Sequence, residues 1–275
     1  MQHFSPPPPL ALEIQGLVKR FDRPAVDGLD LTVRPGEFYA LVGPNGAGKT
    51  TTLRMVAGLL RPDAGMIRVG GIDALADPVA AKRITAWISD EPMIYEKLTP
   101  REYLEFVAGL WGVEPAVAAA RAAELLDWLD LAPHADERCE GFSKGMRQKV
   151  ALAGALVHEP RMIILDEPLT GLDAGSARQV KTVLRDRTRA GGTVIMTTHI
   201  LEVAERMADR IGIIAHGRLI AEGTLEELRQ QAGAKGTKGA KAQVSAKNGT
   251  TDGAPNGASL EDTFLALVAE TAQAA

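Results

Sequence analysis

Apolar residues along this chain form two patterns: short uninterrupted runs, and longer stretches with apolar positions three or four residues apart. The short runs are typical of buried strands. They fall at residues 12–18, 29–33, 38–42, 66–69, 85–89, 162–165, 194–197, 211–214 and 218–222. The longer stretches predict helices at residues 49–60, 99–131, 143–158 and 174–190. Because strands alternate with helices, we predict an α/β fold with a mainly parallel sheet.

The same pattern divides the chain into parts. Residues 10–231 form one predicted domain, and the helices at about 90–158 form a subdomain inserted between two of its strands. Residues 1–9 contain four prolines and are expected to be disordered. Residues 232–258 have almost no large apolar side chain and are interpreted as a flexible linker. A capping-box pattern then opens a C-terminal helix predicted over 259–275.

Composition and charge indicate the cellular compartment of the protein and the kinds of partner it is expected to bind. Hydrophobic residues make up 45% of the chain, enough for a sizeable core, and the net charge of -4 disfavours general binding to nucleic acid. The single cysteine, Cys139, cannot form an internal disulfide and is expected to be an inert, reduced thiol. No apolar run approaches the roughly 18 residues that span a bilayer. The N-terminus lacks a signal-peptide pattern, so we expect a cytoplasmic protein, soluble or peripheral to a membrane.

A phosphate-binding loop follows the apolar run at 38–42. The sequence GPNGAGKTT fits G-x-x-x-x-G-K-[ST], in which glycines let backbone amides point at a phosphate and the following helix adds partial positive charge. Lys49 would reach the β- and γ-phosphates, and the Thr50 hydroxyl would bind Mg²⁺. A chance glycine-rich turn is the alternative, but the flanking strand and helix argue against it. The residues predicted to bind ATP here are Gly43, Pro44, Asn45, Gly46, Ala47, Gly48, Lys49, Thr50 and Thr51.

Two adjacent carboxylates end the apolar run in MIILDEP. Successive strand residues face opposite ways, so Asp166 and Glu167 can take different roles. Asp166 would hold Mg²⁺, directly or through water, and Glu167 would act as general base on the attacking water. A solvated strand end is the alternative.

A third motif, FSKGMRQK at 142–149, opens a helix just upstream of these carboxylates. Ser143 is a natural N-cap, and a helix N-terminus with a free hydroxyl attracts anions. Taken alone, the motif is also what an ordinary capped helix would have.

The three motifs in this order resemble the ATPase subunit of an ATP-binding-cassette (ABC) transporter, over about residues 10–229 and the helix at 259–269. The resemblance implies a P-loop NTPase (RecA-like) fold: a mainly parallel sheet core, an antiparallel β region and an inserted α-helical subdomain. It also implies ATP and Mg²⁺ as cofactors, two ATPase subunits that sandwich two ATP molecules, and a separate integral-membrane permease. FSKGMRQK is typical of exporters of drugs, antibiotics, sodium or polysaccharide. We therefore expect an ATPase on the inner face of the cell membrane that powers export.

The resemblance also assigns roles to single residues. Thr51 would contact the α-phosphate, and the segment Ser143, Lys144 and Gly145 would bind the γ-phosphate of ATP held by a second copy. His199, after the run TVIMTT, matches the switch histidine that contacts the γ-phosphate, although a lone histidine is more often structural.

Two further matches carry alternatives of their own. Asp173 in TGLD matches the loop that passes signals across the dimer, and it would also serve as a helix N-cap. Phe21 fits the aromatic residue that stacks on adenine, with a core phenylalanine as the alternative.

The chain departs from the commoner family pattern at two places. The start of FSKGMRQK corresponds to a segment that more commonly reads LSGGQ in the family. It differs from LSGGQ at three positions, where Phe142, Lys144 and Met146 replace Leu, Gly and Gln. Asp90 stands where a glutamine usually senses the γ-phosphate and Mg²⁺, and a carboxylate cannot donate as an amide does. We keep Asp90 as a candidate magnesium residue, reached through water.

Four apolar residues follow Asp90 on a surface-type loop: Met93, Ile94, Tyr95 and Leu98. We expect them to line the groove that receives the permease, and core packing is the alternative.

Other functions fit the sequence less well. Ribosome-associated cassette ATPases carry two cassettes in one chain, and DNA-associated ones carry long coiled coils, whereas this chain has one cassette and no sustained heptads. A small-molecule kinase would explain the phosphate loop but neither FSKGMRQK nor TGLD.

Overall fold

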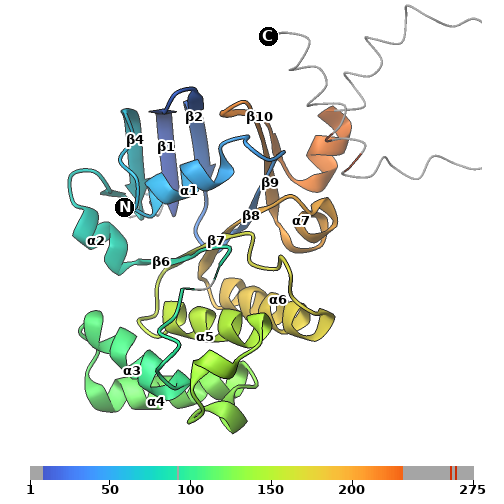
Figure 1. Cartoon of the computed structure of the whole chain (residues 1–275). Helices are drawn as coiled ribbons and strands as arrows, with labels where there is room; N and C mark the ends of the chain where they lie inside the picture. The colour runs from blue at the N-terminus through green and yellow to red at the C-terminus, as the bar shows by residue number, and fades with distance from the viewer. Residues whose placement is uncertain (1–8, 92, 232–260, 262–263, 265–275) are drawn as a thin grey trace, which may run out of the picture.

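The computed structural model describes residues 9–91, 93–231, 261 and 264, and Figure 1 shows how its elements are arranged. A six-stranded sheet with the order β10-β9-β3-β8-β7-β6 forms its centre. The strands are β3 (Phe38–Val42), β6 (Thr85–Ile88), β7 (Met162–Asp166), β8 (Thr193–Thr198), β9 (Arg210–Ala215) and β10 (Arg218–Gly223). All neighbours are parallel except β10, which pairs antiparallel with β9. The predicted mainly parallel α/β sheet is confirmed.

A second, antiparallel sheet has the order β2-β1-β4-β5. Its strands are β1 (Leu12–Arg20), β2 (Pro24–Val33), β4 (Ala64–Val69) and β5 (Ile72–Asp73). The helix α1 (Lys49–Val56) lies between the two sheets. One apolar cluster unites Leu53 of α1 with Ile14 of β1, Leu41 of β3 and Ile164 of β7. This sheet is the antiparallel β region implied by the family resemblance.

A group of helices lies on the other side of the central sheet (Figure 1). It comprises α3 (Pro100–Leu110), α4 (Pro115–Trp128) and α5 (Lys144–Leu156), with short 3-10 turns at Ala132–His134 and Cys139–Gly141. All of these elements fall between β6 and β7 in sequence. Thr99 starts α3 with a full capping box to Glu102, because the Thr99 hydroxyl accepts from the Glu102 amide and the Glu102 carboxylate accepts from the Thr99 amide.

The short elements β5, α2 (Pro78–Arg83) and α7 (Leu201–Met207), and a helical segment at residues 225–231, escaped prediction. A local signal marked α2, because Asp77 accepts from the Ala80 amide and Pro78 occupies the first helical turn. The long helix α6 (Ala174–Arg189) agrees with its predicted range to within one residue.

The predicted helix at 49–60 ends early, at Val56, and this prediction was wrong at its C-terminal end. Gly58 has a φ of +66° and the amides of Leu59 and Leu60 donate to the carbonyl of Arg54, which closes the helix with a left-handed glycine. Leu59, beyond the end of the helix, is consequently exposed.

Predictions for the two ends of the chain mostly lie outside the described residues. The lead-in at 1–8 and the linker at 232–258 are not part of the description. Of the C-terminal helix, only Glu261 and Phe264 are described. Both are helical, and Phe264 packs against the apolar cluster of Ala40, Ile213 and Leu228.

Candidate functional site

The loop between β3 and α1 is shaped for close approach of backbone to a ligand. Gly46 and Gly48 have φ values of +79° and +105°, which side-chain-bearing residues rarely adopt. A Cβ on Gly43 would clash with the carbonyl oxygen of Ile214, and one on Gly48 would clash with that of Ala25. The loop therefore needs glycine at these places for its conformation and for its packing.

Lys49 closes across this loop. Its Nζ donates to the carbonyl oxygens of Gly43 at 2.7 Å and Pro44 at 3.2 Å, and the residue is buried. Burial lowers the pKa of Lys49, while the nearby carboxylates of Glu167 and Asp166 act in the opposite direction. The two carbonyl oxygens thus hold the ammonium against the backbone of the loop.

Thr50 and Asp166 meet directly. The Thr50 hydroxyl donates to Oδ1 of Asp166 at 3.1 Å, and the Thr197 hydroxyl donates to the same oxygen at 2.5 Å. Asp166 is 2% exposed and ends β7 opposite Thr197 of β8. A buried carboxylate beside two hydroxyls is the oxygen donor set that Mg²⁺ prefers, so the residues present fit the metal implied by the family. Sequence reasoning missed Thr197, whose signal was a hydroxyl at the end of the run TVIMTT.

Glu167 and His199 form a second pair beside the first. Glu167 has a φ of +47°, and its amide donates to the Thr197 hydroxyl at 3.0 Å. The Glu167 carboxylate lies 2.9 Å from Nδ1 of His199 and accepts from the Thr170 hydroxyl at 3.3 Å. The backbone turn sends Asp166 and Glu167 in different directions, and this agrees with the two roles expected of adjacent acids.

These residues share one edge of the central sheet. The phosphate loop follows β3, Glu167 follows β7 and His199 follows β8, and these three strands are parallel neighbours. Ligands of open α/β sheets bind at the carboxyl ends of the strands, which is this edge. The structure thereby brings together Lys49, Thr50, Asp166, Glu167 and His199.

Asp173 is an N-cap, as its alternative predicted. It accepts from the amides of Gly175 and Ser176 at 2.9 and 3.0 Å and from the Ser176 hydroxyl at 2.7 Å. These hydrogen bonds, with those from Ser176 the strongest, lower the pKa of Asp173. The cap positions the loop that precedes α6. A role of Asp173 in passing signals across a dimer stays a prediction.

The segment Ser143–Gly145 lies apart from the phosphate loop of its own chain. Ser143 is exposed, caps α5 and accepts from the Met146 amide at 3.2 Å. Within residues 9–91 and 93–231, no hydrogen bond or ion pair joins Ser143, Lys144 or Gly145 to residues 43–51. A Cβ on Gly145 would clash with the hydroxyl of Ser176, so this segment packs on the start of α6 instead.

Phe21 lies in the turn between β1 and β2, and its ring is 60% exposed. The core alternative is therefore wrong. The turn leads into Ala25, whose carbonyl contacts Gly48 of the phosphate loop, and Nζ of Lys19 lies 5.6 Å from the ring centroid. The exposed ring is available to a ligand, and stacking of Phe21 on adenine stays a prediction.

Asp90 is not brought to the other magnesium candidates. It is exposed in the loop after β6, and its Oδ1 accepts from the neighbouring Glu91 amide at 3.0 Å. No hydrogen bond among the described residues joins Asp90 to Thr50 or Asp166. The reason is local, because a carboxylate at the start of a loop readily bonds the next backbone amide. β6 does neighbour β7, so Asp90 follows the same edge of the sheet as Glu167, and its role stays a prediction.

Two negative findings concern metals and membranes. Among the described residues, no group of three or more His, Cys, Asp or Glu side chains is placed to hold a metal by itself. A magnesium site with few protein ligands and phosphate oxygens agrees with this. Nor does any helix in that part of the chain combine the length and hydropathy needed to cross a membrane.

Comparisons with known proteins agree with this geometry. The family model described as "ABC transporter" matches residues 26–170. The daunorubicin/doxorubicin resistance ATP-binding protein DrrA of Streptomyces peucetius is 44% identical, over 82% of this chain and 69% of that protein. The Nod factor export ATP-binding protein I of Burkholderia lata is 39% identical, over 78% and 71% of the two chains.

Solved structures match the fold as well. The ATP-binding subunit of an ABC transporter superposes with a TM-score of 0.80 at 32% identity, covering 94% of this chain and 99% of that chain. A dimeric ATP-binding cassette solved in a post-hydrolysis state with ADP and phosphate superposes with a TM-score of 0.70 at 24% identity and supports the fold alone. The phosphate loop, the paired carboxylates and these matches together show that the chain belongs to the ABC transporter family, as an ATP-binding ATPase subunit of a transporter.

Proposed function

We propose that this chain hydrolyses ATP with Mg²⁺ as one of two ATPase subunits that drive a separate exporter permease. The observation that carries the proposal is the meeting of Lys49, Asp166, Glu167 and His199 at one sheet edge. Bound Mg²⁺ would neutralise phosphate charge and would be held by Thr50 and Asp166, with Asp90 as a further candidate. Lys49 would bind the β- and γ-phosphates.

Glu167 would take the proton from the attacking water. Its carboxylate is oriented by the Thr170 hydroxyl and by His199, which would hold it in position for the attacking water. His199 is half exposed, which leaves its imidazole free to contact a γ-phosphate that enters from the solvent side.

The composite dimer rests on the position of Ser143–Gly145. The N-terminus of α5 is an anion-attracting feature, yet it does not contact the phosphate loop of its own chain. The exposed Ser143 would instead meet ATP held by a second copy, and Asp173 would lie at the same boundary, next to Gly145. A homodimer with two shared ATP sites follows.

The permease would dock in a groove on the helical side of the sheet. A cavity of about 460 Å³ lies between β6, α3 and α5, and its lining includes Trp87, Met93, Trp111 and His158. Met93 is 86% exposed, and the indole of Trp111 stacks on His158 at 4.3 Å between centroids. Exposed apolar surface of this extent marks an interaction site. Ile94 and Leu98 instead pack against the helical core.

Export, rather than import, rests on the relatives. Those named for daunorubicin/doxorubicin resistance and for Nod factor export support an exporter, and docking on a permease would place the chain on the inner face of the cell membrane. No comparison supports the alternative of a ribosome- or DNA-associated ATPase.

ATP hydrolysis by the purified chain tests the proposal. We expect Mg²⁺-dependent release of phosphate, and Lys49→Ala should lower it by about 10²-fold because the phosphate charge loses its fixed ammonium. Arg189→Ala, on the exposed end of α6, is the matched control and should match the wild type. Equal rates for the wild type and Lys49→Ala would show that the phosphate loop is not the site of hydrolysis.

A further inference from the structure

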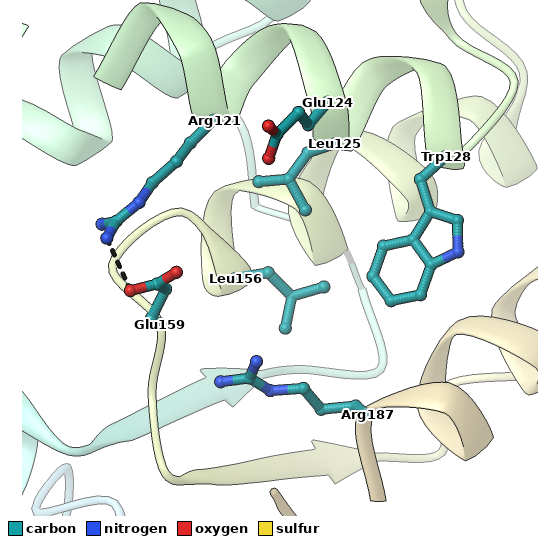
Figure 2. Close-up of a pocket in the computed structure, with 7 residues that line it drawn as sticks. All are labelled: Arg121, Glu124, Leu125, Trp128, Leu156, Glu159 and Arg187. Atoms are coloured by element: carbon teal, nitrogen blue, oxygen red, sulfur yellow. Dashed lines mark hydrogen bonds and ion pairs between the residues drawn. The ribbon is translucent and has the colours of Figure 1, made fainter. Parts of the chain in front are cut away.

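A second cavity lies at the edge of the central sheet opposite the phosphate loop. It has a volume of about 300 Å³ and is lined by one face of α4, the end of α5 and the end of α6 (Figure 2). Helices α5 and α6 end where the parallel strands β7 and β8 begin, whereas the phosphate loop follows the carboxyl end of β3. The cavity is therefore separate from the ATP site, and nothing in the proposed ATPase cycle uses it.

Three apolar side chains form the body of this cavity. Leu125 and Trp128 project from α4, one turn apart, and Leu156 from α5 faces them. The end of α4 is held in place because Gln179 of α6 donates to the backbone carbonyl of Trp128 at 2.5 Å. The cavity thus offers an indole and two leucine side chains to an apolar ligand.

One of the two arginines at the cavity is already neutralised. Arg121 donates to the Glu159 carboxylate at 2.5 Å and to the Val157 carbonyl at 3.2 Å. This ion pair leaves neither Arg121 nor Glu159 as the main charged contact for a ligand.

Arg187 is the second arginine, and its guanidinium is fixed but incompletely satisfied. Its terminal nitrogen Nη2 donates to the Pro160 carbonyl at 2.6 Å. Gly192 packs against the side chain, so close that a Cβ on Gly192 would be 3.1 Å from the Arg187 Nε. That Nε is buried and has no hydrogen-bond partner among the described residues. Protein atoms cover this Nε, so a ligand carboxylate would instead bind the terminal guanidinium nitrogens, for which the Pro160 carbonyl is the acceptor within the described ranges.

Glu124 supplies the opposite charge on the other wall. It projects from α4 toward the cavity, across from Arg187 (Figure 2), and forms no ion pair within the described ranges. Since Arg121 and Glu159 are paired with each other, a simple anion would leave Glu124 without an opposite charge, and a simple cation would leave Arg187 without one. The lining is balanced for a ligand that carries both charges.

We propose that this cavity binds a small zwitterion with an aromatic or branched apolar body, of about the size of an aromatic amino acid. The ligand carboxylate would bind Arg187, its ammonium would bind Glu124, and its apolar body would lie among Leu125, Leu156 and Trp128. Helix α4 belongs to the inserted helices, whereas α6 connects β7 to β8 of the central sheet. A ligand bound to both helices would therefore link the inserted helices to the rest of the domain.

The test is a ligand-observed NMR titration of the full chain with L-phenylalanine, without nucleotide. We expect saturable binding with a Kd of about 1 mM, in the range for a ligand of this size. Two single-charge analogues, 3-phenylpropionate and 2-phenylethylamine, should each bind about tenfold more weakly. Equal binding of all three compounds, or no saturation by L-phenylalanine at 20 times the expected Kd (~20 mM), would overturn the proposal.

Variants then assign the two charges. Arg187→Gln should weaken L-phenylalanine about tenfold and leave 2-phenylethylamine unchanged, and Glu124→Gln should do the reverse with 3-phenylpropionate unchanged. Because Arg187 also bonds Pro160, Arg187→Lys keeps the charge if Arg187→Gln fails to fold. Arg189→Gln is the control for the loss of a nearby charge, and Trp111→Ala is the control for binding in the groove proposed for the permease. A loss of L-phenylalanine binding with either variant would place the ligand outside this cavity. The readout does not involve ATP, so its failure would not touch the ATPase proposal.

Discussion

The imidazole Nδ1 of His199 lies 2.9 Å from the Glu167 carboxylate, so the proposed general base and the proposed γ-phosphate contact touch each other directly. They come from the ends of two neighbouring parallel strands, β7 and β8. This contact and the Thr170 hydroxyl hold the Glu167 carboxylate from two sides.

Glu167→Gln should bind ATP normally and hydrolyse it about 10²–10⁴-fold more slowly, because an amide cannot accept the proton from water. The variant should also accumulate as an ATP-bound dimer, seen by size-exclusion chromatography with ATP. Glu202→Gln on α7 is the control, since its partner is the exposed Arg206. Turnover within tenfold of the wild type would exclude Glu167 as the base.

Ser143 and Lys49 should act on the same ATP from opposite subunits. A mixed dimer of one Ser143→Arg subunit and one Lys49→Ala subunit should keep one intact site, measured as photolabelling by an azido-ATP. The matched control puts both substitutions in one subunit and pairs it with the wild type. That dimer should have no intact site, and full labelling of it would show that each chain completes its own site.

Asp90 should link metal and permease without contributing to ATP affinity. Asp90→Gln should retain most activity, whereas Asp90→Ala should weaken permease-stimulated hydrolysis more than ATP binding, because its carboxylate would reach Mg²⁺ only through water. The measurement is permease-stimulated ATPase across a Mg²⁺ titration. Identical curves for Asp90→Ala and the wild type would make Asp90 an ordinary solvated loop residue.

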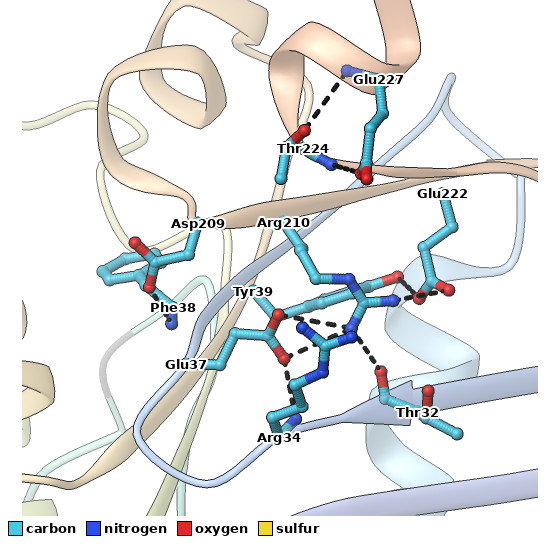
Figure 3. A network of polar contacts seen from close by, with 10 residues as sticks. All are labelled: Thr32, Arg34, Glu37, Phe38, Tyr39, Asp209, Arg210, Glu222, Thr224 and Glu227. Carbon is cyan, nitrogen blue, oxygen red and sulfur yellow. Dashed lines mark hydrogen bonds and ion pairs between the residues drawn. The ribbon is translucent and has the colours of Figure 1, made fainter. Parts of the chain in front are cut away.

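Arg210 should be essential to stability, because it neutralises two carboxylates between the sheets (Figure 3). It lies 3.3 Å from Glu37 and 2.8 Å from Glu222, and the Tyr39 hydroxyl donates to Glu222 at 2.8 Å. Arg210→Met would leave buried Glu37 unpaired, and we expect a loss of about 3 kcal/mol in the free energy of unfolding, measured in urea.

The control for Arg210 is Arg206→Met on α7, whose exposed pair with Glu202 should contribute at most about 0.5 kcal/mol. If the two substitutions cost the same free energy of unfolding, the network around Arg210 is no more important than a surface ion pair.

Cys139 should stay unreactive in the folded protein. It is fully buried, and burial raises the pKa of its thiol to about 11, so little thiolate exists at neutral pH. We expect a disulfide reagent such as DTNB at pH 8 to react with Cys139 only after unfolding in urea, and its rate to follow the unfolding transition. Rapid labelling without denaturant would contradict the inert role expected of this cysteine.

Much of the site was predictable because its motifs act through short-range geometry. A strand, six loop positions and a helix start are contiguous, so GPNGAGKTT by itself specified where Lys49 and Thr50 lie relative to one another. MIILDEP likewise specified two acids at a strand end. The parallel sheet followed from alternating strands and helices.

Short elements and helix ends were less predictable. The pattern could not stop α1 at Val56, because apolar residues continue past Gly58 and only the left-handed backbone ends the helix. β5 and α7 are too short for periodicity to reveal them.

The sequence by itself determined the family, the phosphate loop and the paired acids, since each is a contiguous motif whose chemistry depends on neighbouring residues. Only the tertiary structure decided that Thr197 joins Asp166 to Glu167, that Phe21 is exposed and that Gly145 packs against Ser176 at the start of α6. These relationships depend on the order of strands in the sheet and on which helix ends meet. Strand order is set by the packing of residues far apart in sequence, which no local pattern records.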